Sequence, residues 1–146
     1  MKTIAIILAL SSVVSGAEAD ISLSPRRQIR PGDTITVLAT GYSKYEGRIG
    51  GGPRNCLGEP VDDATIAVDP RFIPIGSLVR IAGRIFKARD VGSSIVGRRI
   101  DRHFSSSRAA NRYRRTVTIE VISVGNHRYN RWYARRFGGR HHSEQS

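Results

Sequence analysis

Short stretches of alternating apolar and polar residues recur along the chain. The clearest spans residues 34–39, where Ile35, Val37 and Ala39 fall on one side and Thr34, Thr36 and Leu38 fall on the other. This period of two is typical of a half-buried strand. Further strands are predicted at residues 64–68, 78–82, 85–89, 100–101 and 116–122. Many short strands separated by glycine and proline turns indicate a mainly β protein, a small barrel or sandwich.

The segments between these strands carry turn and helix signals. Gly83-Arg84 predicts a hairpin turn, whose second strand leads to Asp90. Residues 47–60 are too glycine-rich for regular structure, and a loop of this length is expected to border a functional site. Ser105-Ser106-Ser107 offers helix caps before one short helix at residues 108–113.

The two ends of the chain differ from this pattern. Residues 1–19 combine a positive start, a short apolar run and a small-residue cleavage site, which is typical of a signal peptide. The run is shorter than the roughly 20 residues that span a bilayer, and no cysteine follows it for a lipid anchor. We therefore expect a secreted or periplasmic protein without a membrane span. Residues 20–33 are interpreted as an N-terminal arm, 34–124 as the domain and 125–146 as a basic flexible tail.

The charge of the chain restricts its partners. There are 24 lysines and arginines against 12 acidic residues, a net charge of +12, and removal of Lys2 and Glu18 with the signal peptide leaves that balance unchanged. Such a field attracts polyanions, whether nucleic acid, anionic lipid or anionic wall polymer. Export favours anionic cell-wall polymers.

Three aspartates stand out in so basic a chain. Asp90 and Asp101 bracket a loop of small residues, in which Gly92, Ser93 and Ser94 let the backbone turn sharply and a bulky ligand approach closely. Asp69 lies upstream, before a proline, where an aspartate is also a common turn former.

These aspartates lie within four motifs that hold a fixed order and spacing. The motifs are Ala67-Val68-Asp69-Pro70, Ile73-Pro74-Ile75-Gly76-Ser77, Asp90-Val91-Gly92-Ser93-Ser94-Ile95-Val96-Gly97 and Ile100-Asp101. They resemble the three-aspartate (3D) domain, the catalytic core shared by the membrane-bound lytic transglycosylase A family and by small secreted cell-wall proteins. The resemblance covers about residues 36–122 and departs where the usual Thr-Gly-Gly-Ala is Val91-Gly92-Ser93-Ser94. It implies a six-stranded double-psi β-barrel with one short helix.

The resemblance also implies an activity. A lytic transglycosylase breaks the β-1,4 bond between N-acetylmuramic acid and N-acetylglucosamine in peptidoglycan and leaves a 1,6-anhydro product, using one acid/base and no activated water. That residue maps onto Asp101, whose pKa must rise from about 3.9 for it to carry a proton; the like charge of Asp90 would help. Asp90 and Asp69 would shape the site, and Gly92, Ser93 and Ser94 would contact substrate. No cofactor and no metal are expected, and the protein is expected to be a monomer.

Four other residues are candidates for a place in or near the site. Thr40 and Tyr42 resemble the family's opening Thr-Ala-Tyr and are candidates to line the groove, with Tyr42 either stacking on a sugar or buried with its hydroxyl satisfied. His103 shares a strand face with Asp101 if that strand continues, but a solvent-facing histidine is the simpler expectation. Cys56 is the sole cysteine, so it forms no internal disulfide and is expected to be a small, partly buried thiol.

Two other functions remain open. A non-catalytic, expansin-like module on the same barrel would bind or loosen the wall without forming product. Nucleic-acid binding would explain the charge, but carboxylates in a groove repel phosphate and the aspartate loop would have no role.

Overall fold

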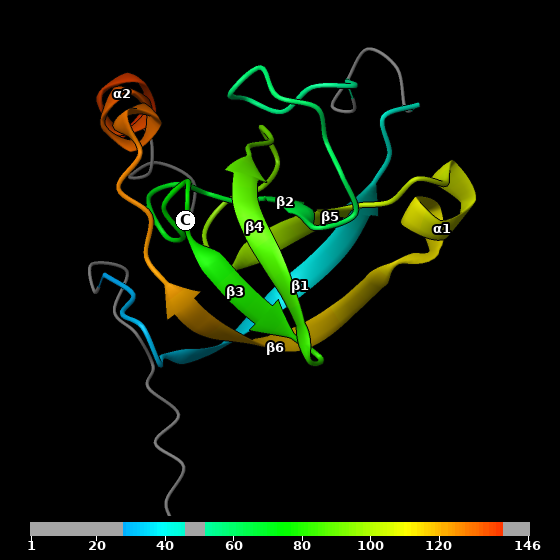
Figure 1. Cartoon of the computed structure of the whole chain (residues 1–146), viewed down its shortest axis with the longest axis horizontal. Coiled ribbons are helices and arrows are strands. Elements are labelled where there is room, and N and C mark those ends of the chain that lie inside the picture. Colours follow the sequence, from blue (N-terminus) through cyan, green and yellow to red (C-terminus); the bar gives the residue numbers. More distant parts are fainter. Residues whose placement is uncertain (1–27, 46–51, 139–146) are drawn as a thin grey trace, which may run out of the picture.

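The computed structural model describes residues 28–45 and 52–138, so the predicted signal peptide and most of the predicted arm lie outside the described residues. Figure 1 shows its elements in chain order. They are β1 (Thr34–Tyr42), β2 (Thr65–Ala67), β3 (Leu78–Ile81), β4 (Arg84–Asp90), β5 (Arg99–His103), α1 (Ser107–Arg112), β6 (Arg114–Ser123) and α2 (Arg128–Phe137).

The six strands close into a barrel in the order β1-β5-β2-β4-β3-β6. Two neighbouring pairs, β1 with β5 and β2 with β4, are parallel, and the other four pairs are antiparallel. Parallel neighbours need crossover connections, whereas antiparallel ones need only hairpins. The mainly β fold and the closed six-stranded barrel predicted from the sequence are confirmed.

The barrel interior holds the apolar side of each alternating strand. Ile35, Val37 and Ala39 of β1 are at most 3% exposed and pack in one cluster with Phe86 and Ile100. The β3–β4 hairpin is displaced by one residue from its prediction. Its turn is Ala82-Gly83, with φ of 46° and 78°, because a two-residue turn of this type needs positive φ at both central positions.

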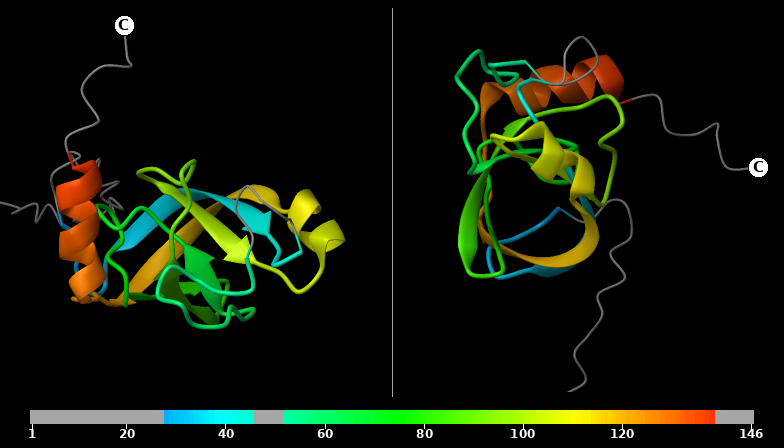
Figure 2. Two further views of the ribbon diagram at one scale, coloured as in Figure 1. Left: turned by 90° about the horizontal axis from the view of Figure 1, so that it is seen from above. Right: turned by 90° about the vertical axis from the view of Figure 1, so that its right-hand side faces the viewer.

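The C-terminal segment corrects the prediction of a flexible tail and of a single helix. Residues 128–137 form α2, and Figure 2 shows it at the opposite end of the barrel from α1. The prediction counted charges and overlooked that Tyr129, Trp132, Tyr133 and Phe137 recur at helical spacing. Tyr133 is buried against the domain, which gives this short helix the tertiary contact that it needs.

The start of the described chain also packs on the barrel. Ile29 is only 4% exposed within the core, and the Gly32 N–H donates to the Val121 carbonyl at 2.8 Å. Residues 28–33, predicted as the end of an extended arm, are therefore part of the domain. None of the helices within residues 28–45 and 52–138 has the length and apolar character needed to cross a bilayer.

Candidate active site

Strand β2 lies between the strands that carry two of the three aspartates. Ala67 is in register with Asp101 on one side and with Asp90 on the other. Because neighbouring strands lie about 4.8 Å apart, the Cα atoms of the two aspartates are separated by roughly 10 Å.

A register shift decides where Asp90 points. Phe86 and Ala88 of β4 face the barrel interior, so strict alternation would send Asp90 inward too. Between Ile66 and Ala67 the pairing jumps from Ala88 to Asp90 and skips one residue. Such irregularities re-aim side chains near functional sites, and here the shift places Asp90, in place of Arg89, opposite Ala67 of β2.

The Asp90 carboxylate is held by three donors and no cation. Its Oδ1 accepts the backbone N–H groups of Cys56 at 3.0 Å and Val91 at 2.9 Å, and its Oδ2 accepts the Tyr42 hydroxyl at 2.9 Å. Burial raises the pKa of Asp90, although these hydrogen bonds and the nearby His103 oppose the rise. Asp90 is thus a carboxylate whose charge is disfavoured by its surroundings.

Asp101 lies on β5, which β2 separates from β4 and Asp90. It is half-buried, and its Oδ1 accepts the Thr40 hydroxyl at 2.9 Å, from the residue directly opposite on β1. Thr40 therefore orients the carboxyl group that the resemblance assigns as the acid/base. Asp101 is the central residue of β5, and Thr40 lies two residues before the end of β1.

Tyr42 and His103 fill the space behind the two aspartates. Tyr42 is 4% exposed, so the structure favours the buried alternative over a sugar-stacking platform. Burial and then the Asp90 charge raise the pKa of its hydroxyl. His103 is 3% exposed, with its ring 5.4 Å from that of Tyr42. The expectation of a solvent-facing histidine was wrong, because the Tyr42 ring and Asp63, 3.5 Å from Nδ1, cover this end of β5.

Asp69 is held apart from this pair. Its carboxylate accepts the Arg71 guanidinium through Nε at 2.8 Å and Nη2 at 2.8 Å, and the Gly97 N–H at 2.9 Å. Burial alone would raise the pKa of Asp69, but the Arg71 and Gly97 hydrogen bonds outweigh burial and lower it. Because Gly97 has a φ of 61°, where glycine is favoured, Asp69 fixes the far end of the aspartate loop.

The predicted substrate loop borders a hollow that also involves α2. Gly92 and Ser93 line a cavity of about 460 Å³ together with Arg71 and the aromatic residues of α2. Ser94 is exposed but does not line this cavity. Within residues 28–45 and 52–138, no cluster of three histidine, cysteine or acidic side chains could hold a metal ion.

Two contributors to the site were missed by the sequence analysis. The Cys56 N–H is a backbone group and carries no side-chain signal, although the surrounding loop was correctly expected to border the site. The aromatic face of α2 had a readable signal in its helical spacing. Cys56 itself is half-buried, and burial followed by the Asp90 charge raises the pKa of its thiol to about 12.

Comparison with known proteins finds relatives for part of the chain. Residues 64–123 match the model of the 3D domain family. The cell wall-binding protein YocH of Bacillus subtilis is 37% identical over 93 residues, which is 61% of this chain and 32% of YocH. The putative cell wall shaping protein YabE of the same organism is 42% identical over 60 residues, 40% of this chain and 15% of YabE.

Among solved structures, the crystal structure of MltA from Escherichia coli is similar to part of this chain. It is 22% identical, with a TM-score of 0.42, over 49% of this chain and 28% of MltA. The chain spans about a third or less of the length of the relatives that it matches.

Proposed function

We propose that this protein is a peptidoglycan lytic transglycosylase that acts outside the cytoplasm, with Asp101 as its single acid/base. The observation that carries the proposal is the way the other two aspartates are held. Asp69 is neutralised by Arg71, and Asp90 accepts three donors. Neither is well suited to activate water or attack a sugar, as the second carboxylate of most glycosidases does.

A one-carboxylate mechanism fits this arrangement. Asp101, oriented by Thr40, would protonate the glycosidic oxygen and release the N-acetylglucosamine end. The resulting carboxylate would then take the proton of the C6 hydroxyl of N-acetylmuramic acid as that oxygen closes the 1,6-anhydro ring. Burial disfavours the charge of Asp90. When Asp90 is protonated, it adds no negative charge near Asp101. When it is ionised, its charge repels the Asp101 anion.

The family and the relatives' names support a role at the cell wall. We propose that residues 1–19 direct export and that the positive charge of +12 holds the protein near anionic wall polymers. The relatives named for cell wall binding and cell wall shaping are consistent with this setting.

The test is mass spectrometry of purified peptidoglycan after incubation with the mature protein. Wild type is expected to release 1,6-anhydro-muropeptides and Asp101→Asn to release none. Glu120→Gln is the matched control, since it also removes one acid but lies 45% exposed on β6, paired with Arg80. Products with ordinary reducing ends, or full activity of Asp101→Asn, would overturn the proposed mechanism.

A wall-binding module without catalysis is the second candidate, and the relative named as cell wall-binding favours it. It predicts co-sedimentation of the protein with intact peptidoglycan and no soluble product from wild type. The same incubation therefore separates the two functions, provided that the pellet and the supernatant are both examined.

A further inference from the structure

Helix α2 lies outside the segment that matches the 3D domain family, yet it is fixed firmly to the barrel. The Asn130 side chain holds both backbone groups of Ile75, at 2.7 Å and 3.1 Å. At the other end of the helix, Arg71 donates to the Phe137 carbonyl at 3.3 Å. Because Arg71 also holds Asp69, α2 is tied to the aspartate loop.

The chain before α2 is built for this close approach. A Cβ atom on Gly125 would lie 2.2 Å from the Ile75 carbonyl oxygen, so only glycine fits there. The His127 side chain then accepts the Tyr129 N–H at 3.1 Å and caps the first turn. The orientation of α2 relative to the site is therefore specified by the sequence.

The aromatic face of α2 is turned toward the site. Tyr129 and Trp132 have ring centroids 5.1 Å apart, and Tyr133 and Phe137 continue the cluster. Tyr129 and Trp132 line two cavities at once, one of about 460 Å³ beside Gly92 and Ser93 and one of about 490 Å³ beside Cys56. Trp132 remains 47% exposed. Two aromatic rings, tilted by 45° to each other, thus lie between a hollow beside Cys56 and one beside Gly92 and Ser93.

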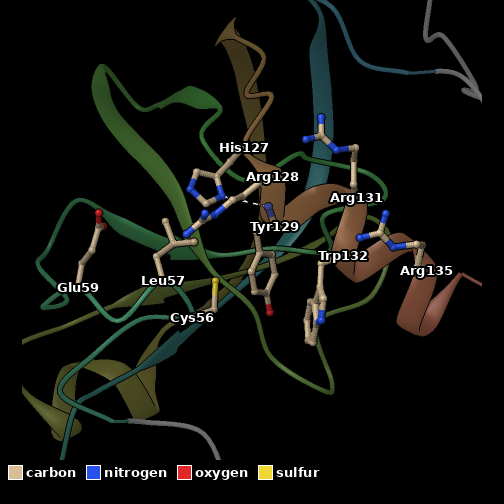
Figure 3. A pocket seen from close by; sticks show the side chains of 9 residues that line it. All are labelled: Cys56, Leu57, Glu59, His127, Arg128, Tyr129, Arg131, Trp132 and Arg135. Carbon is tan, nitrogen blue, oxygen red and sulfur yellow. Dashed lines mark hydrogen bonds between the residues drawn. The ribbon is translucent and has the colours of Figure 1, made fainter.

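The second of these hollows is strongly basic. Figure 3 shows Arg128, Arg131 and Arg135 around it, with Glu59 on the opposite wall. Glu59 already lies 3.5 Å from Arg89. In the part of the chain that the structure describes, none of the three α2 arginines has a carboxylate within ion-pair distance, and α2 itself contains no acidic residue. Exposed guanidinium groups bind carboxylates through paired hydrogen bonds.

We propose that α2 is the wall of a binding groove for glycan strands that carry carboxylate-bearing peptide stems. A sugar ring packs on Tyr129 and Trp132, and stem carboxylates bind Arg131 and Arg135. This inference rests on the proposed function and deepens it, because it makes the acidic stem a requirement for tight binding. An anionic membrane is the competing occupant, but the aromatic face of a membrane-bound helix points away from its domain, whereas Tyr133 of α2 is buried against it.

The test measures binding of soluble muropeptide fragments, with and without their stems, by calorimetry. All variants are made in the Asp101→Asn background so that no turnover occurs. Arg131→Gln with Arg135→Gln is expected to weaken binding of stem-bearing fragments at least about tenfold, the equivalent of roughly 1.4 kcal/mol, and to leave stem-free fragments unaffected. Trp132→Ala is expected to weaken both.

The matched control is Arg108→Gln with Arg112→Gln, which removes the same charge from α1, at the opposite end of the barrel. Equal losses in the α1 and α2 variants, or unchanged binding in the α2 variant, would overturn the inference. Binding of phosphatidylglycerol vesicles that depends on α2, without stem-dependent glycan binding, would overturn it in favour of a membrane.

Failure of the groove and failure of the enzyme give different results. Anhydro products from wild type, together with an α2 variant that binds stems as tightly as its Asp101→Asn parent, would remove the inference and leave the activity. Stem binding that depends on α2, without product from wild type, would remove the activity and leave the groove.

Discussion

Asp69 and Asp90 are two carboxylates withdrawn from solvent on neighbouring segments of one domain, and their surroundings have opposite effects. Asp69 is paired with the Arg71 guanidinium at 2.8 Å, and its pKa is lowered. Asp90 is bound by a hydroxyl and two backbone N–H groups, and burial raises its pKa. Burial acts on both, so the presence of a cation decides the sign of the shift.

The difference separates holding a loop from serving a site. A carboxylate with a permanent cation keeps its charge and fixes structure, as Asp69 does for Gly97 and the aspartate loop. A carboxylate that is held only by neutral donors can change its protonation state when a ligand displaces water, and perturbed groups of that kind concentrate at functional sites. Asp90 is of the second kind, and β2 separates it from the strand that carries Asp101.

The largest effect is expected where the cation is removed. Arg71→Met leaves Asp69 buried without its partner, and such changes cost about 3–5 kcal/mol. With 22% of the Arg71 side chain exposed, we expect the lower end, about 3 kcal/mol, in urea unfolding at pH 7. Arg80→Met, at an exposed ion pair with Glu120, is the control and should cost less than about 1 kcal/mol. Equal losses would show that Asp69 does not depend on Arg71.

The pH dependence of stability is expected to differ in sign between the two aspartates. The lowered pKa of Asp69 contributes stability that is present above its unfolded pKa and lost as the pH falls through its folded pKa. The raised pKa of Asp90 contributes stability that is present below the unfolded pKa and lost as the pH rises through the folded pKa.

Isosteric asparagine variants make this contrast measurable. At pH 7, Asp69→Asn should lose roughly 2 kcal/mol, because its bonds to a charged partner are worth about 1.5–3 kcal/mol. Asp90→Asn should instead be slightly more stable than wild type. Both differences are expected to shrink as urea unfolding is repeated toward pH 3. A destabilised Asp90→Asn at pH 7 would contradict the direction of its pKa.

The sequence was sufficient for the parts of the fold that depend on local alternation. Ile35, Val37 and Ala39 identified a half-buried strand, and the motifs around Asp69, Asp90 and Asp101 lie within the segment that matches the 3D domain family. The packing of alternating side chains is encoded along the strand itself.

The rest depended on contacts between distant segments. The register shift that places Asp90 opposite Ala67 arises from pairing with β2 and has no mark in the β4 sequence. His103 is buried because Asp63 and Tyr42 cover it, although its own neighbours are polar. The aromatic residues of α2 recur at helical spacing, but the arginines between them obscured this pattern, which only a count by helical spacing would have shown.

A smaller effect is expected when Asp90 loses its hydroxyl donor. Tyr42→Phe removes the 2.9 Å bond to Oδ2 and keeps the ring against His103, and the loss of such a bond costs about 1 kcal/mol. Tyr45→Phe is the control, since Tyr45 is 68% exposed and surface changes stay within about 0.5 kcal/mol. Both are measured by urea unfolding at pH 7. No difference between them would mean that water replaces the tyrosine hydroxyl at Asp90.

The smallest change in stability, and the most direct report on Asp90, is expected at Cys56. Burial and then the Asp90 charge raise the pKa of this thiol from 9.0 to about 12. Because the thiolate is the reactive form, alkylation of Cys56 at pH 8 should be roughly a thousandfold slower in the folded protein than in the urea-unfolded chain. Asp90→Asn removes the second cause but leaves burial, so labelling of that variant should be faster than wild type and still slower than the unfolded chain. Equal labelling rates in wild type and Asp90→Asn would mean that the Asp90 carboxyl group already carries a proton at pH 8. The difference between the raised pKa of Asp90 and the lowered pKa of Asp69 would then be larger than the directions of the two shifts require.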